Sequence, residues 1–179
     1  MSDAPRYKMY VDIAAVTIAF VGISTYFFGE YLKEVRDRRG AVYDLVGALQ
    51  SDPLLGKRLT ILKAFSDVRT QAFLASGPPG GELSRYVGAK VDGSPELWGA
   101  LIRVVYFFDE LQTCIDASRC HRETARSWLL ADASEVDRLF GSYVNESAAQ
   151  FGLPRLGCGL AKFSDAPLSV RCITAMSVN

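Results

Sequence analysis

The chain has 179 residues, of which 49% are hydrophobic, and its 20 basic side chains are balanced by 20 acidic ones. This length is sufficient for one domain whose core is stable without disulfides. Because the net charge is zero, no overall field attracts polyanions, and we expect no nucleic-acid partner. The hydrophobic residues are unevenly distributed, however, with a solid block near the N-terminus.

This block predicts a transmembrane helix over residues 11–29, preceded by an N-terminal tail over residues 1–10. Residues 13–28 carry no charged side chain, and aromatic residues flank the stretch on both sides. A span across about 30 Å of hydrocarbon needs roughly 20 residues, with 17 near the lower limit. Aromatic rings are typical of the headgroup level. We therefore expect the lipid bilayer to be a partner of this chain.

Two alternatives compete with the membrane span. A cleaved signal peptide would also begin with basic residues, but its apolar region is shorter and ends at a small-x-small site. Here the run ends in Tyr-Phe-Phe and continues into a charged segment. A buried core helix would show a polar face, whereas this stretch offers few polar residues. The composition favours an anchor.

Basic residues beside the span predict its orientation. Two precede it and four follow it: Arg6 and Lys8, then Lys33, Arg36, Arg38 and Arg39. The positive-inside rule therefore places the C-terminal domain in the cytoplasm, with the span in the inner membrane if the source is bacterial. The same basic run, with Lys57 and Arg58, is also able to contact anionic headgroups, although a topology signal is the simpler role.

The cysteines do not determine on which side of the membrane the C-terminal domain lies. Their even number allows two disulfides, and free thiols in a reducing compartment fit equally well. The four are Cys114, Cys120, Cys158 and Cys172.

The remaining pattern predicts an all-α protein in which the span continues into a small helical bundle. Residues 30–40 continue the membrane helix as a juxtamembrane segment, and residues 41–150 form the helical domain. Gly40 permits a bend, and the apolar residues that recur at helical spacing over 42–49 predict a separate short helix after it. The same spacing predicts a further helix over 54–75. The Gly- and Pro-rich stretch 76–81 breaks the chain and is the best candidate for a mobile loop, and a short helix follows over 82–91.

The clearest element begins at Ser94. This serine is a suitable N-cap, Pro95 fits the first helical position and Glu96 complements the positive helix end. An apolar stripe follows from Leu97 to Ile115, and this helix is expected to form the centre of the core.

Two further helices are predicted, one over residues 121–130 and one that starts at a Ser-x-x-Asp box beginning at Ser134. Scattered glycines and prolines then predict an irregular, loosely docked or extended tail over residues 151–179. Its only β-prone run covers residues 169–175.

One segment resembles a known family. From Leu97 to Val144 the sequence reads LWGALIRVVYFFDELQTCIDASRCHRETARSWLLADASEVDRLFGSYV, and the resemblance covers residues 98–144. The part most similar to the family is Phe107-Phe108-Asp109-Glu110-Leu111. The pattern is similar to that of a bacterial family of single-pass membrane proteins that is known only as a domain of unknown function. The resemblance implies one N-terminal membrane helix before a cytoplasmic helical domain, and it implies no activity.

The sharpest candidate for chemistry is Cys114-x5-Cys120-His121, with Cys158 or Cys172 as a further ligand. Zinc accepts thiolate and imidazole ligands, but structural sites usually space their cysteines more closely. A Cys–His nucleophile would have to use the single histidine, which is adjacent to Cys120 in sequence. No G-x-S-x-G elbow accompanies that histidine. We expect neither a metal nor a catalytic site.

Two other patterns have a plain structural interpretation. Residues 152–162 resemble a phosphate loop only superficially, because the G-K-[ST] ending is missing. Asp109 and Glu110 lie on the apolar helix, where partial burial can perturb a carboxylate. A pair with an arginine such as Arg103, or exposure to water, is the more ordinary role.

We therefore expect a membrane-anchored helical interaction protein, such as an accessory subunit or adaptor of a membrane assembly, rather than an enzyme, and we expect no cofactor. Small residues in the span favour close packing against a partner protein or a second copy: Ala14, Ala15, Ala19, Gly22 and Ser24. The alternative is a membrane-tethered sensor or regulator that binds a small ligand between its helices.

Overall fold

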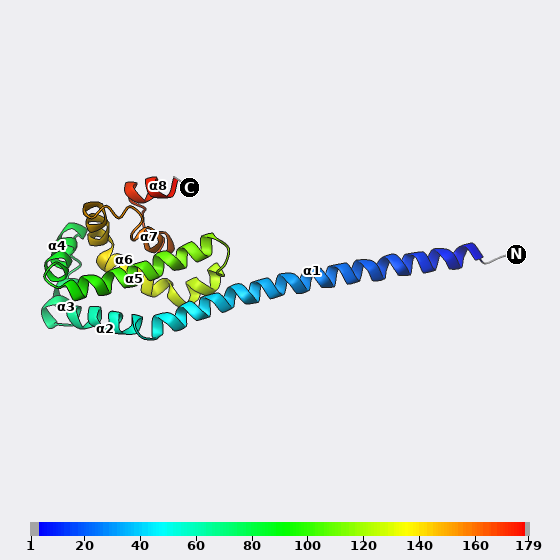
Figure 1. The fold of residues 1–179 in the computed structure, drawn as a ribbon, viewed down its shortest axis with the longest axis horizontal. Helices are drawn as coiled ribbons and strands as arrows, with labels where there is room; N and C mark the ends of the chain where they lie inside the picture. The colour runs from blue at the N-terminus through cyan, green and yellow to red at the C-terminus, as the bar shows by residue number, and fades with distance from the viewer. Residues whose placement is uncertain (1–3, 178–179) are drawn as a thin grey trace.

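The computed structural model describes the backbone of residues 4–177 and the side chains of residues 25–177. Every regular element in this part of the chain is an α-helix, which confirms the all-α prediction (Figure 1). The helices are α1 (Ala4–Gln50), α2 (Leu54–Phe65), α3 (Val68–Ala75), α4 (Gly80–Val91), α5 (Pro95–Asp116), α6 (Arg122–Gln150), α7 (Cys158–Phe163) and α8 (Val170–Ser177).

Helix α1 is much longer than the others and extends away from the bundle toward the N-terminus (Figure 1). Its last turns belong to the core, because Val42, Val46 and Leu49 lie on one face and are buried. The backbone N–H of His121 also donates to the Arg38 carbonyl, with an N···O distance of 3.2 Å. The helix passes through Gly40 without a break, so the segment predicted as a separate short helix is the end of α1.

The predicted span over residues 11–29 lies, except for residues 25–29, outside the described side chains. Among the residues whose side chains the structure describes, no helix is long and apolar enough to cross a bilayer.

Helix α5 forms the centre of the core, as predicted. The Ser94 hydroxyl accepts a hydrogen bond from the Leu97 backbone N–H, and Pro95 occupies the first turn. Leu101, Val105 and Phe108 have almost no exposed surface. Helices α2 and α7 pack along α5, and α4 packs against α6.

The helix predicted over residues 54–75 is two helices. Helix α2 ends at Phe65, and Asp67 restarts the chain in an extended conformation in which its carboxylate accepts the Thr70 backbone N–H. The carboxylate acts as an N-cap, which satisfies a backbone donor at the start of α3. The periodicity alone did not reveal this break.

The opposite error occurs farther along the chain. Residues 121–130 and the segment after Ser134 form one continuous helix, α6, so Ser134 is not a cap. No glycine or proline separates Leu130 from Ser134, so nothing opposes helix propagation there. The cap lies earlier, where the His121 imidazole accepts the Thr124 backbone N–H.

The prediction of an irregular, loosely docked tail is also wrong. Residues 158–163 form α7 and residues 170–177 form α8, so the β-prone run is helical. A disulfide between Cys158 and Cys172 joins the two helices. Arg171 on α8 donates three hydrogen bonds to the carbonyls of Leu153, Pro154 and Leu156. These contacts are long-range, so the local sequence pattern could not reveal them.

Asp109 on α5 docks this segment onto the core. Its carboxylate accepts the backbone N–H groups of Gly157, at 2.8 Å, and of Leu160, at 3.0 Å. The two helices touch closely at Gly159, where an added Cβ would lie 2.5 Å from the Asp109 Cα. Gly157 has a φ of 77°, a conformation that favours glycine. The loop that superficially resembles a phosphate loop therefore binds a carboxylate of its own chain.

Candidate functional site

A groove with a volume of about 560 Å³ opens between α2, α3, α5 and α6. Its floor is made by the buried apolar side chains of the core, which are Leu49, Phe65, Leu101, Val104, Phe108 and Phe140. Its volume lies in the range of small-molecule sites, which are mostly apolar with a few polar groups. We call this cavity the four-helix groove.

The mouth of the four-helix groove combines exposed apolar residues with ion pairs. Leu62 on α2 is largely exposed, and the half-buried Leu139 on α6 lines the same groove. The Arg58 guanidinium donates to the Asp132 carboxylate at 2.9 Å, which joins α2 to α6. The Arg58 side chain is 32% exposed and the Asp132 side chain 45%, so the pair contributes only about 0–1 kcal/mol.

A second ion pair lies farther along the same rim of α6. Arg138 donates two hydrogen bonds to the Glu135 carboxylate, at 2.7 and 3.0 Å. The hydrogen bonds from this guanidinium lower the pKa of the Glu135 carboxyl and raise the pKa of Arg138. The charges of the rim therefore compensate one another, and the floor offers only apolar surface. The arrangement is suited to binding an uncharged apolar group rather than to acid–base chemistry.

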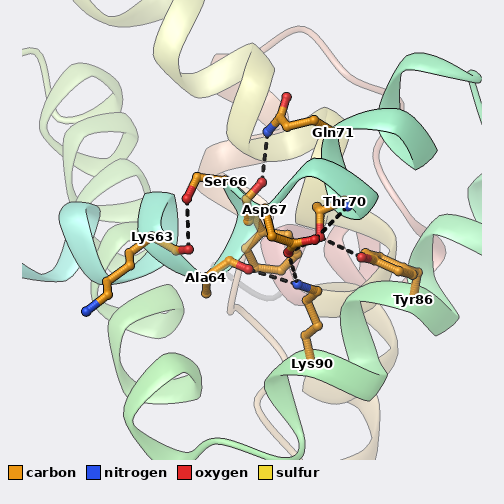
Figure 2. Close-up of polar contacts among 9 residues, drawn as sticks. Lys63, Ala64, Ser66, Asp67, Thr70, Gln71, Tyr86 and Lys90 are labelled. Atoms are coloured by element: carbon orange, nitrogen blue, oxygen red, sulfur yellow. Dashed lines mark hydrogen bonds and ion pairs between the residues drawn. The ribbon is translucent and has the colours of Figure 1, made fainter.

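A polar network fixes the wall of the groove that α3 provides (Figure 2). Lys90 on α4 donates to the Asp67 carboxylate at 2.7 Å and to the Ala64 carbonyl at 2.9 Å. The fully buried Thr70 hydroxyl donates to Asp67 at 2.5 Å and lies 2.6 Å from the Tyr86 hydroxyl. These contacts tie the end of α2, the start of α3 and the face of α4 together.

Charge and aromatic contacts strengthen the same network. The hydrogen bond from Lys90, followed by those from Thr70, holds the pKa of the Asp67 carboxyl far below its ordinary value. The same hydrogen bond to Asp67 raises the pKa of Lys90. The Lys90 ammonium also lies 5.5 Å from the centre of the Phe65 ring, a distance at which cation–π attraction operates. Because Phe65 is part of the groove floor, the network positions a residue of the groove itself.

The sequence did not single out Asp67, Thr70, Tyr86 or Lys90. The available signal was the Asp-x-x-Thr spacing at residues 67–70, which is typical of an N-cap. The partners on α4 could not be found in this way, because the pairing depends on how α4 packs against the α2–α3 turn.

The structure gives the residues that suggested chemistry structural roles. Cys114 and Cys120 form one disulfide, and Cys158 and Cys172 form the other. His121 caps α6 through the Thr124 amide. In this state neither the zinc ligand set nor a Cys–His nucleophile is assembled within the described part of the chain.

The two carboxylates of α5 also differ from the expectation. Asp109 contacts backbone amides rather than Arg103, which is exposed. Burial raises the pKa of the Asp109 carboxyl, whereas its backbone hydrogen bonds oppose that rise. Glu110 is exposed to solvent, as the more ordinary interpretation predicted.

Comparisons of the chain with family models, with curated proteins and with solved structures find no match. The resemblance to a family of single-pass membrane proteins stays a prediction.

Proposed function

We propose that the protein is a membrane-anchored helical interaction protein whose bundle is held close to the bilayer by α1. The observation that carries this proposal is a collar of exposed aromatic residues where α1 leaves the bundle. Tyr26, Phe27 and Phe28 are 66%, 67% and 63% exposed, and Tyr31 is 61% exposed. We call these four residues the aromatic collar.

The geometry of the aromatic collar favours lipid over a single partner helix. Successive residues of an α-helix point about 100° apart, so Tyr26, Phe27 and Phe28 face three different directions. A protein partner would usually cover one stripe of the helix, whereas a membrane interface surrounds it. Large exposed apolar surface of this kind commonly marks a contact with a membrane or a protein. The uncharged stretch that precedes the collar in sequence supports the same interpretation.

The anchor is tested by alkaline carbonate extraction of membranes from cells that express the full chain. We expect the wild-type chain to stay in the membrane pellet. The matched control carries Val16→Asp and Ile18→Asp, because each charge at the centre of a span costs about 2.5–3.5 kcal/mol. Release of the wild-type chain by carbonate would contradict the proposal, and so would retention of the double variant.

We further propose that the bundle lies on the oxidising, non-cytoplasmic side of this membrane. All four cysteines are paired, and disulfides are rare in reducing compartments. The four basic residues after the span favour the cytoplasm. However, charge counts have little influence when the following segment is a whole folded domain. The pairing of the cysteines is therefore the stronger indication of the side on which the bundle lies. The proposed side is opposite to the cytoplasmic side that the basic residues predict.

Protease treatment of spheroplasts tests the orientation. Degradation of the bundle without lysis is the expected result. A gel-shift assay with a maleimide polymer on the denatured, unreduced chain should find no reactive thiol. A protected bundle with four reactive thiols would instead place the domain in the cytoplasm.

A second candidate function is that of a membrane-tethered sensor that binds a small ligand between its helices. The specific observation in its favour is the four-helix groove, whose apolar floor reaches the centre of the core. Ligand binding to the folded state raises the apparent stability. A thermal-shift series with uncharged apolar compounds therefore tests this candidate, and a melting temperature that no compound changes would count against it.

A further inference from the structure

A separate cavity lies between the C-terminal ends of α4 and α6 and the first turn of α5. It has a volume of about 640 Å³, and Val91, Gln150 and Pro95 line it at these three helix ends. It shares no lining residue with the four-helix groove. We call it the Trp98 cavity, after the half-buried tryptophan of α5 that forms part of its wall.

Three aromatic rings line the Trp98 cavity. The centre of the Trp98 ring lies 5.9 Å from that of Tyr143 and 5.8 Å from that of Phe151. The Tyr143 ring is almost perpendicular to the indole, and the Phe151 ring is tilted by 48°. The rings therefore present surfaces in different directions rather than forming one flat stack. Phe151 is 59% exposed, so the cluster opens to solvent and is not part of the closed core.

Two carboxylates line the same cavity. Asp92 accepts a hydrogen bond from the Tyr143 hydroxyl at 2.5 Å, and Glu146 accepts one from the buried Ser84 hydroxyl at 2.9 Å. Neither carboxylate belongs to an ion pair of the described residues. The lining contains one basic side chain, Arg85, whose Nε donates to a backbone carbonyl of its own helix. Two carboxylates against one guanidinium leave an excess of negative charge.

The backbone and Tyr143 are consistent with this excess. Helices α4 and α6 both end at the cavity, and the carbonyl end of a helix carries a partial negative charge. The start of α5 contributes the opposite sign, but Glu96 in its first turn compensates it. Burial, followed by the hydrogen bond to Asp92, raises the pKa of the Tyr143 hydroxyl to about 12. The phenol therefore stays protonated at neutral pH and continues to donate to Asp92.

This combination of rings and carboxylates is suited to a weakly hydrated cation. The face of an aromatic ring attracts a cation, and cages of such rings recognise quaternary ammonium ligands. A primary ammonium is strongly hydrated, and the ring faces offer no good acceptors to replace its water. A quaternary ammonium has no N–H donor to satisfy. Its methyl groups can contact the rings while nearby carboxylates compensate its charge.

We propose that the Trp98 cavity binds one small quaternary ammonium compound, whose methyl groups contact the three rings and whose charge the two carboxylates balance. The site goes beyond the function proposed above and requires neither the anchor nor the four-helix groove. If α1 is anchored, the cavity faces away from the bilayer, because α4 lies at the end of the bundle opposite to the N-terminal part of α1 (Figure 1). The ligand is therefore a free solute rather than part of a membrane.

Isothermal titration calorimetry of the full chain in maltoside micelles tests the proposal, with choline as the probe. The compound 3,3-dimethylbutan-1-ol has the shape of choline without its charge, and ethanolamine carries a primary ammonium. We expect choline to bind at one site and each of the other two at least about five-fold more weakly, a factor that corresponds to about 1 kcal/mol. Equal affinity for choline and the neutral alcohol would overturn the proposal, and so would a lack of choline binding.

Phosphocholine distinguishes the source of the ammonium group. It carries the same quaternary ammonium next to a phosphate, as in a lipid headgroup. We expect it to bind no more tightly than choline, because the lining has an excess of negative charge. Tighter binding of phosphocholine would overturn the assignment to a free solute.

Tryptophan fluorescence shows whether choline binds in this cavity. The chain has two tryptophans, so Trp98 is the only one left in the Trp128→Leu variant. Trp128 contacts Tyr43 and lies outside the lining of the cavity. We expect this variant to keep the wild-type affinity and its emission to change with the same midpoint as the calorimetric titration. Emission that stays constant at saturating choline would overturn the location.

Two substitutions separate the contributions of ring and charge. Phe151→Leu keeps an apolar side chain but removes a ring, and it should lower the affinity for choline about two- to five-fold. Glu146→Gln keeps an acceptor for Ser84 but removes a charge, and it should also weaken choline binding. Neither change should affect the binding of the neutral alcohol to the same degree. Glu110→Gln is the matched control for the charge, because Glu110 is exposed on α5 outside the cavity lining.

The fold of these variants is checked by thermal unfolding. Phe151 and Glu146 are both exposed, so we expect melting temperatures close to that of the wild type. A weaker affinity for choline then reflects the site and not the fold. Wild-type affinity in both the Phe151→Leu and the Glu146→Gln variants would overturn the proposal.

Discussion

Asp109 accepts a hydrogen bond from the backbone N–H of Gly157, 48 positions later in the sequence, at a distance of 2.8 Å. The second oxygen of the same carboxylate accepts the Leu160 N–H. One side chain in the C-terminal half of α5 thus satisfies two backbone donors at the start of α7. Such donors are costly when they are buried without a partner. The carboxylate is a structural anchor for residues 151–177.

Replacement of this carboxylate should loosen the C-terminal segment. In the Asp109→Ala variant the amides of Gly157 and Leu160 lose their acceptor, and each unsatisfied buried donor costs about 1–3 kcal/mol. We expect Asp109→Asn to be less damaging, because one acceptor oxygen remains. Urea unfolding of both variants measures the difference. A stability equal to that of the wild type in Asp109→Ala would show that the hydrogen bonds contribute nothing.

Gly159 permits the close approach of α7 to α5, and we expect Gly159→Ala to destabilise the protein by about 1–3 kcal/mol through overpacking. The added Cβ would lie 2.5 Å from the Asp109 Cα and 3.1 Å from its carbonyl oxygen, both of them backbone atoms that cannot simply rotate away. Thermal unfolding is the measurement.

The matched control for this prediction is Gly99→Ala within α5. Apart from its chain neighbours and the nearby backbone of α5 itself, no atom lies within 4 Å of the position that its Cβ would take. Because alanine is the better helix former, this variant should keep or raise the stability by up to about 1 kcal/mol. A similar melting temperature for the two alanine variants would rule out the steric explanation.

The sequence predicted those elements whose signals are local. Helix α5 has a capping serine, a proline in its first turn and an uninterrupted apolar stripe, and the structure contains each of these features. The helical content, the break near residue 78 and the helix that precedes Asp92 were predicted for the same reason. Caps, prolines and apolar stripes are sufficient to predict a helix where they determine the backbone conformation directly.

The errors arise where distant contacts decide the structure. The tail over residues 151–179 is rich in glycine and proline, so its pattern suggests an irregular segment. Its helices instead depend on Asp109, on the Cys158–Cys172 disulfide and on Arg171. The four-helix groove was foreseen only as a general possibility, because its lining combines residues from α2, α3, α5 and α6. No local pattern encodes such a combination.

The two disulfides should contribute unequally to stability. The Cys158–Cys172 bond closes a loop with a sequence separation of 14, and the Cys114–Cys120 bond one with a separation of 6. Loop-closure entropy assigns about 3 kcal/mol to the first and roughly 2 kcal/mol to the second. We therefore expect Cys158→Ser with Cys172→Ser to be the more destabilising pair in urea unfolding, compared with Cys114→Ser and Cys120→Ser. The reverse order would indicate that strain or unfolded-state structure dominates.

Asp67 should make the stability depend on pH in the acid range. Its folded-state pKa lies far below the ordinary value of 3.8. A carboxyl whose pKa is lowered by folding stabilises the native state above its unfolded pKa, and this contribution is lost as the pH falls toward the folded pKa. We expect Asp67→Asn to be less stable than the wild type at pH 6, because asparagine keeps the helix cap but loses the charge that pairs with Lys90.

The difference between the wild type and Asp67→Asn should shrink as the pH falls through about 4. Burial raises the pKa of Asp109 and of Asp137, so these carboxyls change the stability in the opposite direction. They do so equally in both proteins, and urea titrations from pH 6 to pH 2.5 therefore isolate Asp67 when the two curves are subtracted. A difference that stays constant with pH would mean that its charge contributes nothing to folding.

The four-helix groove predicts saturable binding of an uncharged apolar probe. N-phenyl-1-naphthylamine fluoresces in apolar surroundings and carries no charge that would disturb the ion pairs of the rim. We expect Ala75→Trp to weaken its binding several-fold, because Ala75 is exposed at the mouth of the groove and an indole would fill the entrance. The floor residues stay unchanged in this variant, so its stability should equal that of the wild type.

Ala89→Trp is the matched control for the probe, because Ala89 lines a different cavity on α4, away from the four-helix groove. If the probe binds in the groove, only the Ala75 variant loses affinity. Equal binding by both variants would place the probe elsewhere, on the aromatic collar or in another cavity. The ligand-binding candidate would then lose its physical basis, whereas the membrane anchor, which depends on residues of α1, would be unaffected.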